Sequence, residues 1–125
     1  MSHFQMTSID LSAPRTELHD TLGLTSAEIS CNSLPAGASV PFVHFHEKNE
    51  EIYIILEGEG RLYVDGEERA IKAGDAFRLS PAARRCISAA PSSALRFLCI
   101  QAKAGSLEGF TMNDGRLSEE KPSWM

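Results

Sequence analysis

The sequence lacks the features that would direct it to a membrane, a nucleic acid or an oxidising compartment. No apolar run is long enough to span a bilayer, and residues 1–5 have no basic stretch followed by the apolar run of a signal peptide. The 12 basic residues are outnumbered by 17 acidic ones, which weighs against a nucleic-acid or anionic-membrane partner. The three cysteines form no C-x-x-C pair, which favours reduced, mostly buried thiols. We therefore predict a cytoplasmic protein without nucleic-acid or membrane partners.

The sequence also lacks segments long enough for helical crossovers between parallel strands. From residue 27 onward, short runs rich in β-branched and aromatic residues alternate with turns that contain Gly or Pro. The predicted strands cover residues 28–34, 39–46, 51–56, 61–64, 67–71, 76–79, 84–89 and 95–102. Upstream, 9–11 is a candidate short strand and 16–24 a weak helix that ends near Gly23. Short strands at this spacing indicate an all-β sandwich or barrel.

The chain has 125 residues, the length of a single domain. We divide it into an N-terminal arm (1–26), a β-barrel (27–104) and an irregular C-terminal tail (105–125). Large aromatic side chains rarely stay fully exposed, and the tail contains Phe110 and Trp124. We therefore expect the tail to pack on the barrel or on a partner subunit.

The candidate chemistry centres on His44, His46 and Glu51. Residues two apart in a strand point to the same face, so the two imidazoles project together while Phe45 points away. A polar turn over residues 47–50 then returns the chain, so that Glu51 begins the next strand beside both histidines. Two imidazole nitrogens and one carboxylate oxygen are a suitable ligand set for a divalent metal, and they leave coordination positions open.

The strand that begins at Glu51 separates two faces. Glu51, Tyr53 and Ile55 share one face, which we predict to line a pocket. The other face is apolar and is predicted to be either monomer core or a subunit contact. It carries Ile52, Ile54 and Leu56.

The spacing of these residues resembles the first motif of the cupin family. That motif is matched by Gly37, His44-x-His46, four residues, Glu51, six residues and Gly58, with one extra residue between the first glycine and the first histidine. The resemblance implies a jelly-roll β-barrel that is commonly dimeric and usually holds Fe, Mn, Ni, Zn or Co. Members of the family include dioxygenases, isomerases, epimerases and decarboxylases, as well as non-enzymatic binders.

Two further segments carry the resemblance. Residues 50–60 (EEIYIILEGEG) are very similar to the family's signature strand, and residues 74–81 (GDAFRLSP) resemble the start of its second motif. The flanking strands complete a barrel of cupin size. The fold expected from the resemblance is therefore a cupin-type jelly-roll barrel.

One position departs from the family's pattern. Counting from Gly74, the glycine of the second motif falls on Ala82, and its histidine, which is the family's fourth ligand, falls on Arg85. Arginine stays protonated and cannot ligate a metal. The four-ligand site is therefore not intact, and three interpretations of Arg85 remain open.

In the first interpretation, the metal keeps three protein ligands and the forked donors of Arg85 hold the carboxylate or phosphate of a substrate. In the second, no metal binds, and Arg85 pairs with Glu51 in a pocket for a small organic anion or sugar. In the third, the local register differs and Cys86 is the ligand. The third requires a bulge, because Cys86 should point opposite to Arg85 in a regular strand.

Two functional hypotheses follow for the pocket. The first, which we favour, is a metal-dependent cupin that acts on a small anionic substrate, as a dioxygenase, isomerase or decarboxylase. The second is a metal-free, non-enzymatic binder or sensor built around Glu51 and Arg85. In either case Tyr53, Phe42 and Phe97 are expected to contact the ligand, and Tyr53 is the candidate catalytic acid or hydrogen-bond donor. The sequence does not decide whether the chain is an enzyme.

Overall fold

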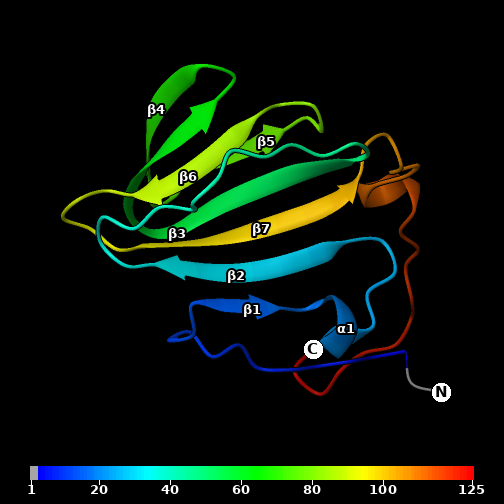
Figure 1. Ribbon diagram of the computed structural model, residues 1–125. Helices are drawn as coiled ribbons and strands as arrows, with labels where there is room; N and C mark the ends of the chain where they lie inside the picture. Colours follow the sequence, from blue (N-terminus) through cyan, green and yellow to red (C-terminus); the bar gives the residue numbers. More distant parts are fainter. Residues whose placement is uncertain (1–2) are drawn as a thin grey trace.

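The computed structural model describes residues 3–125, and its regular secondary structure is mostly antiparallel strands (Figure 1). The strands are β1 (Arg15–Glu17), β2 (Glu28–Leu34), β3 (Asn49–Val64), β4 (Glu67–Lys72), β5 (Ala76–Leu79), β6 (Arg85–Ala89) and β7 (Leu95–Lys103). The helical elements are α1 (His19–Leu22) and the 3-10 turn η1 (Thr111–Asn113). Hydrogen bonding gives the order β1-β2-β7-β3-β4, with β5 and β6 each paired to β3. The all-β architecture expected from the sequence is confirmed.

The long strand β3 joins the two halves of the barrel. Its first half pairs with β7 and β5, and its second half pairs with β4 and β6. The register with β7 shifts between Ile55 and Glu57, where the strand turns from one sheet into the other. The two separate strands predicted over 51–56 and 61–64 are therefore wrong, since they form one continuous strand.

Gly58 and Gly60 explain why this strand continues where the sequence suggested a break. A Cβ on Gly58 would collide with the backbone carbonyl of Ala94, and one on Gly60 would collide with the carbonyl of Ser88. The two glycines allow neighbouring backbone to approach closely. The hairpin predicted at Asp65-Gly66 is present, since Val64 pairs with Glu67 and both turn residues have positive φ.

The predicted strand 39–46 does not form. This segment runs beside β6 but makes only two isolated bridges to it, Ser39 with Ser88 and His44 with Arg85. Pro41 lies between the bridges and has no N–H to donate to a ladder. The segment therefore follows the barrel wall as irregular chain.

The N-terminal arm also differs from the prediction. Residues 9–11 form no strand, because the Asp10 carboxylate accepts a hydrogen bond from the N–H of Ser12 and closes a turn. The helix predicted over 16–24 is reduced to α1, which ends at Gly23 in the left-handed conformation. Just before it, β1 pairs antiparallel with β2 and so extends the barrel sheet.

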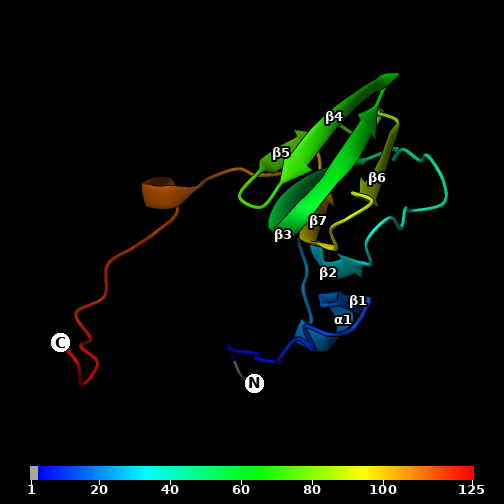
Figure 2. The ribbon, with the colours of Figure 1, turned by 90° about the vertical axis from the view of Figure 1, so that its left-hand side faces the viewer.

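The interior and the tail form two contrasting regions. One continuous core is formed by ten buried residues of β3 to β7. Half of them are Tyr53, Ile55, Leu95, Phe97 and Cys99. Residues 105–125 leave the barrel, as Figure 2 shows, and form only the turn η1. The large apolar side chains of the tail are exposed: Leu107, Phe110, Met112, Leu117, Trp124 and Met125. Within residues 3–125, no helix has the length and apolar character needed to cross a membrane.

Candidate metal centre and ligand cavity

The inner face of the sheet is a ladder of three rungs, each made of residues paired across neighbouring strands. The first rung holds Glu51 and Gln101, and the second holds Tyr53, Cys99 and Ser30. The third rung holds Ile55, Phe97, Asn32 and Arg15. A cavity of about 480 Å³ lies against this face. Its lining includes members of all three rungs together with His44 and His46 from the opposite wall.

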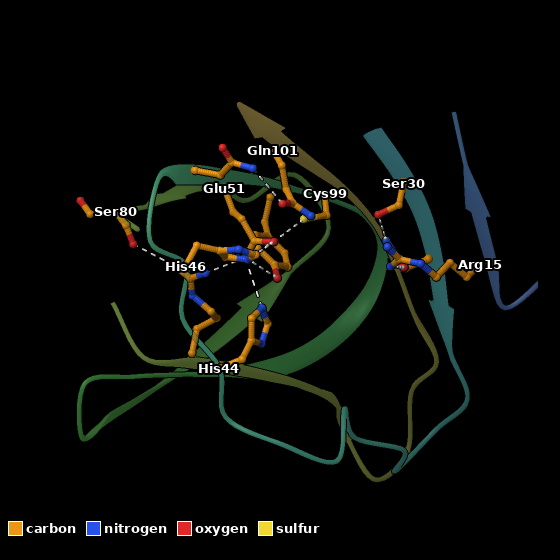
Figure 3. A network of polar contacts seen from close by, with 12 residues as sticks. Arg15, Ser30, His44, His46, Glu51, Ser80, Cys99 and Gln101 are labelled. Carbon is orange, nitrogen blue, oxygen red and sulfur yellow. Dashed lines mark hydrogen bonds and ion pairs between the residues drawn. The ribbon is translucent and has the colours of Figure 1, made fainter. Parts of the chain in front are cut away.

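The predicted metal ligands converge at one end of the cavity (Figure 3). Ligand atoms of His44, His46 and Glu51 all lie within 4.8 Å of one another. His44 Nε2 is 3.8 Å from Glu51 Oε1, and His46 Nε2 is 3.4 Å from Glu51 Oε2. His46 Nε2 is buried and has no hydrogen-bond partner among the described residues. We call this group the metal end of the cavity.

Backbone hydrogen bonds hold the two histidines in place although their segment is not a strand. His44 exchanges two backbone hydrogen bonds with Arg85, at 3.1 and 3.0 Å, and His46 N–H donates to the carbonyl of Pro81 at 2.8 Å. The rings meet edge to face with centroids 5.2 Å apart. Phe45 points outward as predicted, is exposed, and stacks under the Arg84 guanidinium at 4.4 Å.

The Glu51 carboxylate is buried and surrounded by donors. The Tyr53 hydroxyl donates to Oε1 at 3.3 Å, and the Cys99 thiol donates to Oε2 at 3.3 Å. Arg85 Nη1 donates to Oε1 at 3.0 Å. These contacts fix the orientation of the carboxylate, and its Oε2 edge faces His46.

Arg85 lies beneath the metal end and does not line the cavity. Its side chain is 1% exposed, and its Nη2 donates to the carbonyl of Ser80 at 2.7 Å. The pairing with Glu51 agrees with the second interpretation of Arg85 from the sequence. Cys86 points away, as strand parity predicted, and its thiol donates to the carbonyl of Val40 at 3.2 Å.

Burial controls the protonation of the groups around Glu51. It lowers the pKa of His44, against the opposing effect of Glu51, and so favours the neutral imidazole that binds metals. Burial, followed by the Glu51 charge, raises the pKa of the Cys99 thiol to about 12. Burial also raises the pKa of Tyr53 well above its ordinary value. Both Cys99 and Tyr53 therefore remain protonated donors to the carboxylate.

The structure places the other predicted site residues on the same cavity. Tyr53 and Phe97 are buried and stacked, with ring centroids 5.6 Å apart, and both line the cavity. Phe42 lines its outer edge and is 58% exposed.

The sequence analysis missed several residues of the cavity lining, among them Arg15, Asn32, Cys99 and Gln101. Strand parity with Phe97 would have placed Cys99 and Gln101 on the inner face once the strand direction was known. Nothing in the sequence pattern marks Arg15, because its strand is three residues long and lies in the weakly patterned arm.

Comparison with known proteins identifies the family. The model of the cupin domain matches residues 32–101, which is more than half of the chain, so this protein belongs to the cupin family. A cupin protein from Bacteroides fragilis of known structure is 56% identical with a TM-score of 0.92, over 94% of this chain and 99% of that chain. The expected cupin barrel is thereby confirmed.

Two further matches, one to a curated sequence and one to a solved structure, come from Thermotoga maritima. An oxalate-binding protein is 39% identical over 67 residues, which cover 54% of this chain and 54% of that protein. The structure of a predicted oxalate decarboxylase is 35% identical with a TM-score of 0.57, over 60% of this chain and 64% of that chain. The chain thus spans about half the length of the curated relatives it matches.

Proposed function

We propose that this cupin binds a divalent metal ion at His44, His46 and Glu51 and a small anionic ligand beside it. The observation that carries the proposal is the convergence of the three ligand atoms to within 4.8 Å at the wall of a cavity. The buried Nε2 of His46 supports it: this atom is 3.4 Å from Glu51 Oε2 but has no hydrogen-bond partner within residues 3–125, and such an atom is costly unless a ligand satisfies it. The nitrogen and oxygen donor set also suits first-row divalent metals.

The chain's own residues have distinct roles in this proposal. When bound, the metal supplies a Lewis acid for a carbonyl or carboxylate oxygen, or a site for oxygen chemistry. Tyr53, Cys99 and Arg85 orient Glu51 from three sides. A catalytic role for Tyr53 stays a prediction, as do oxygenation, isomerisation and decarboxylation as reactions. The similarity to an oxalate-binding protein supports a carboxylate as the ligand.

The second candidate is a metal-free binder, and the buried Arg85–Glu51 pair favours it. Arg85 Nη1 lies 3.0 Å from Glu51 Oε1, and its positive charge there substitutes for part of the charge that a cation would supply. In this case His44 and His46 act as hydrogen-bond donors to the ligand.

Metal analysis of untagged protein, as purified and after anaerobic reconstitution, separates the two candidates. We expect one metal ion per chain, lost in His46→Ala and retained in the matched control His19→Ala. His19 is exposed and bonded to Asp20, so its loss leaves the cavity unchanged. If no metal is retained under either condition, the metal-binding proposal is wrong and the metal-free binder is favoured.

Arg85→His tests whether position 85 corresponds to the family's fourth ligand. We expect the metal affinity of this variant to rise at least about tenfold, because an imidazole replaces a buried positive charge next to the ion. The measurement is a competition titration against a chromogenic chelator. An unchanged or lower affinity would contradict this interpretation of Arg85.

We also infer that the chain forms a homodimer. The outer face of β2, β7 and β3 is apolar and only partly buried in the monomer: Ile29, Leu98, Ile100, Ile52 and Ile54. The exposed apolar side chains of the tail give a second copy further surface to cover. Analytical ultracentrifugation should give a dimer for the native chain and a monomer for Ile54→Lys, with circular dichroism confirming that the variant is folded. A monomeric native chain would contradict the inference.

A reducing, cytoplasmic location remains part of the proposal. Cys31, Cys86 and Cys99 are all free thiols, and Cys31 and Cys99 are buried. Cell fractionation with a thiol-labelling assay would test it, and recovery of the protein from an oxidising compartment would contradict it.

A further inference from the structure

We propose that Arg15 binds an anionic group of the ligand at the opposite end of the cavity from the metal end. This inference rests on the proposed function, because it names the class of ligand for the same cavity. One interpretation of the sequence was that Arg85 holds the anion, but both Nη atoms of Arg85 are bonded to protein oxygens and its side chain is fully buried. Among the described residues, Arg15 is the arginine that lines this cavity.

Strand register fixes where Arg15 lies relative to Glu51. Arg15 pairs with Asn32, Asn32 with Phe97, and Phe97 with Ile55, so all four belong to the third rung. Glu51 belongs to the first rung, which is two rungs away from Ile55 toward the start of β3. Arg15 and Glu51 therefore occupy diagonally opposite corners of the inner face, and Figure 3 shows them far apart on different strands.

This diagonal sets the length of a ligand that contacts both ends. Three strand spacings amount to about 14 Å across the sheet, and two rungs amount to about 13 Å along it. The concave face and the long arginine side chain shorten the gap, but a molecule as small as oxalate cannot bridge it. Oxalate at the metal end is therefore too short to contact Arg15 as well. A ligand that contacts both ends needs a spacer between its two anionic groups.

The guanidinium of Arg15 is held in place by buried polar residues. Arg15 Nη1 donates to Asn32 Oδ1 at 2.7 Å, and Asn32 Nδ2 donates to Ser30 Oγ at 2.9 Å. Asn32 and Ser30 are 7% and 2% exposed, so they form a fixed support. Arg15 Nε donates to Glu17 at 3.0 Å, which leaves the Nη2 donors for a ligand. The Arg15–Glu17 pair is about half exposed and therefore weak.

Much of the cavity lining is apolar and includes Leu34, Val40, Ile87 and Phe97. The rung between the two ends adds Tyr53 and Cys99, whose O–H and S–H groups already donate to Glu51. A hydrocarbon or aromatic spacer is favoured against such a lining, whereas a chain of hydroxyl groups would lose its hydrogen bonds to water there. The ligand class is therefore an organic acid with metal-binding oxygens at one end, an apolar spacer and a second anionic group at the other end.

A ligand series tests this inference by calorimetric titration. 2-Oxo dicarboxylates of increasing length, from 2-oxoglutarate through 2-oxoadipate to 2-oxosuberate, are each compared with the 2-oxo monocarboxylate of the same chain length. Each binding constant is measured on the native chain, Arg15→Ala and Arg69→Ala, both with metal and without it. Arg69 is a matched control because it is also an exposed arginine paired with a glutamate two residues away, but on β4 outside the cavity.

At one chain length, we expect the native chain and Arg69→Ala to bind the dicarboxylate at least about tenfold more tightly than the monocarboxylate. This is the gain in affinity that one charge-assisted hydrogen bond provides. Arg15→Ala should lose this preference while its metal content and its oxalate affinity stay unchanged. The inference is wrong if the native chain shows no preference at any length, or if Arg15→Ala retains it. If no metal is bound, only the proposed function is contradicted. The preference for the dicarboxylate is a ratio of two binding constants measured on the same preparation, so it can be tested without metal. If no oxo acid binds the protein, with metal or without it, both the proposed function and this inference are wrong.

Discussion

An arginine bonded to a glutamate lies beneath one end of the cavity and another such pair lies at the other end, and the two pairs have the same contact distance but differ in burial. Arg85–Glu51 and Arg15–Glu17 both have a nitrogen–oxygen distance of 3.0 Å. The side chains of the first pair are 1% and 4% exposed, whereas those of the second are 49% and 60% exposed. The same contact thus occurs once in the barrel wall and once at the cavity mouth.

This difference indicates what each arginine can do. Arg85 donates through Nη1 to Glu51 and through Nη2 to Ser80, and its remaining donor, Nε, is buried without a hydrogen-bond partner in the described part of the chain. This guanidinium cannot turn to a ligand without leaving a buried carboxylate unpaired. A half-exposed guanidinium loses little when a ligand displaces its glutamate partner. We therefore assign Arg85 to the support of Glu51 and Arg15 to the ligand.

The largest expected effect that would test this comparison is on stability. Arg85→Met should lower the free energy of unfolding of the metal-free protein by about 3–5 kcal/mol, because it leaves Glu51 buried without its cation. Arg15→Met should lower it by no more than about 1 kcal/mol. The measurement is chemical denaturation in the presence of a chelator. The double variant Arg85→Met/Glu51→Met should recover part of the loss, and equal losses for the two single variants would contradict the comparison.

The next effect concerns metal affinity. Glu51→Gln should weaken metal binding by more than about a hundredfold, because an amide oxygen carries no charge. A residue that coordinates the metal also contributes more to the metal affinity than the residues that support it. Glu17→Gln at the other end should leave the metal affinity unchanged. Chelator competition measures both variants. A metal affinity that falls equally in both would mean that the metal does not bind at Glu51.

The smallest effect is on salt dependence. The preference for a second carboxylate at Arg15 should fall by a few fold between about 0.01 M and about 1 M ionic strength, where the Debye length drops from about 30 Å to about 3 Å. Oxalate affinity at the buried metal end should change less over the same range. Parallel titrations on the native chain give both values. A preference that does not depend on salt would indicate that Arg15 does not supply the attraction.

The motif spacing was sufficient to predict the barrel and the convergence of the three candidate metal ligands. Period-two parity placed Glu51, Tyr53 and Ile55 on one face, and all three are buried. The His-x-His spacing placed both imidazoles on the cavity, although their segment is irregular rather than a strand. Local spacing was enough here because residues close in the sequence share one stretch of backbone.

Predictions that depended on a distant partner were less successful. The sequence suggested a break at Gly58 and Gly60, but these glycines admit the backbones of Ala94 and Ser88 beside a continuous strand. Pro41 prevented the strand predicted over 39–46. For the two glycines the outcome depended on which backbone lies alongside, which is not encoded in local propensity, whereas the missing N–H of Pro41 is a local cause.

The sequence by itself determined the family, the inward-facing pattern of the strands and the convergence of His44, His46 and Glu51. Only the tertiary structure showed that the two arginines lie in different environments. It brought β1 to the edge of β2 and so placed Arg15 on the cavity, and it buried Arg85 beneath Glu51. The physical reason is that the role of a charged side chain depends on its burial and its partners, which are set by strand pairing across distant parts of the chain.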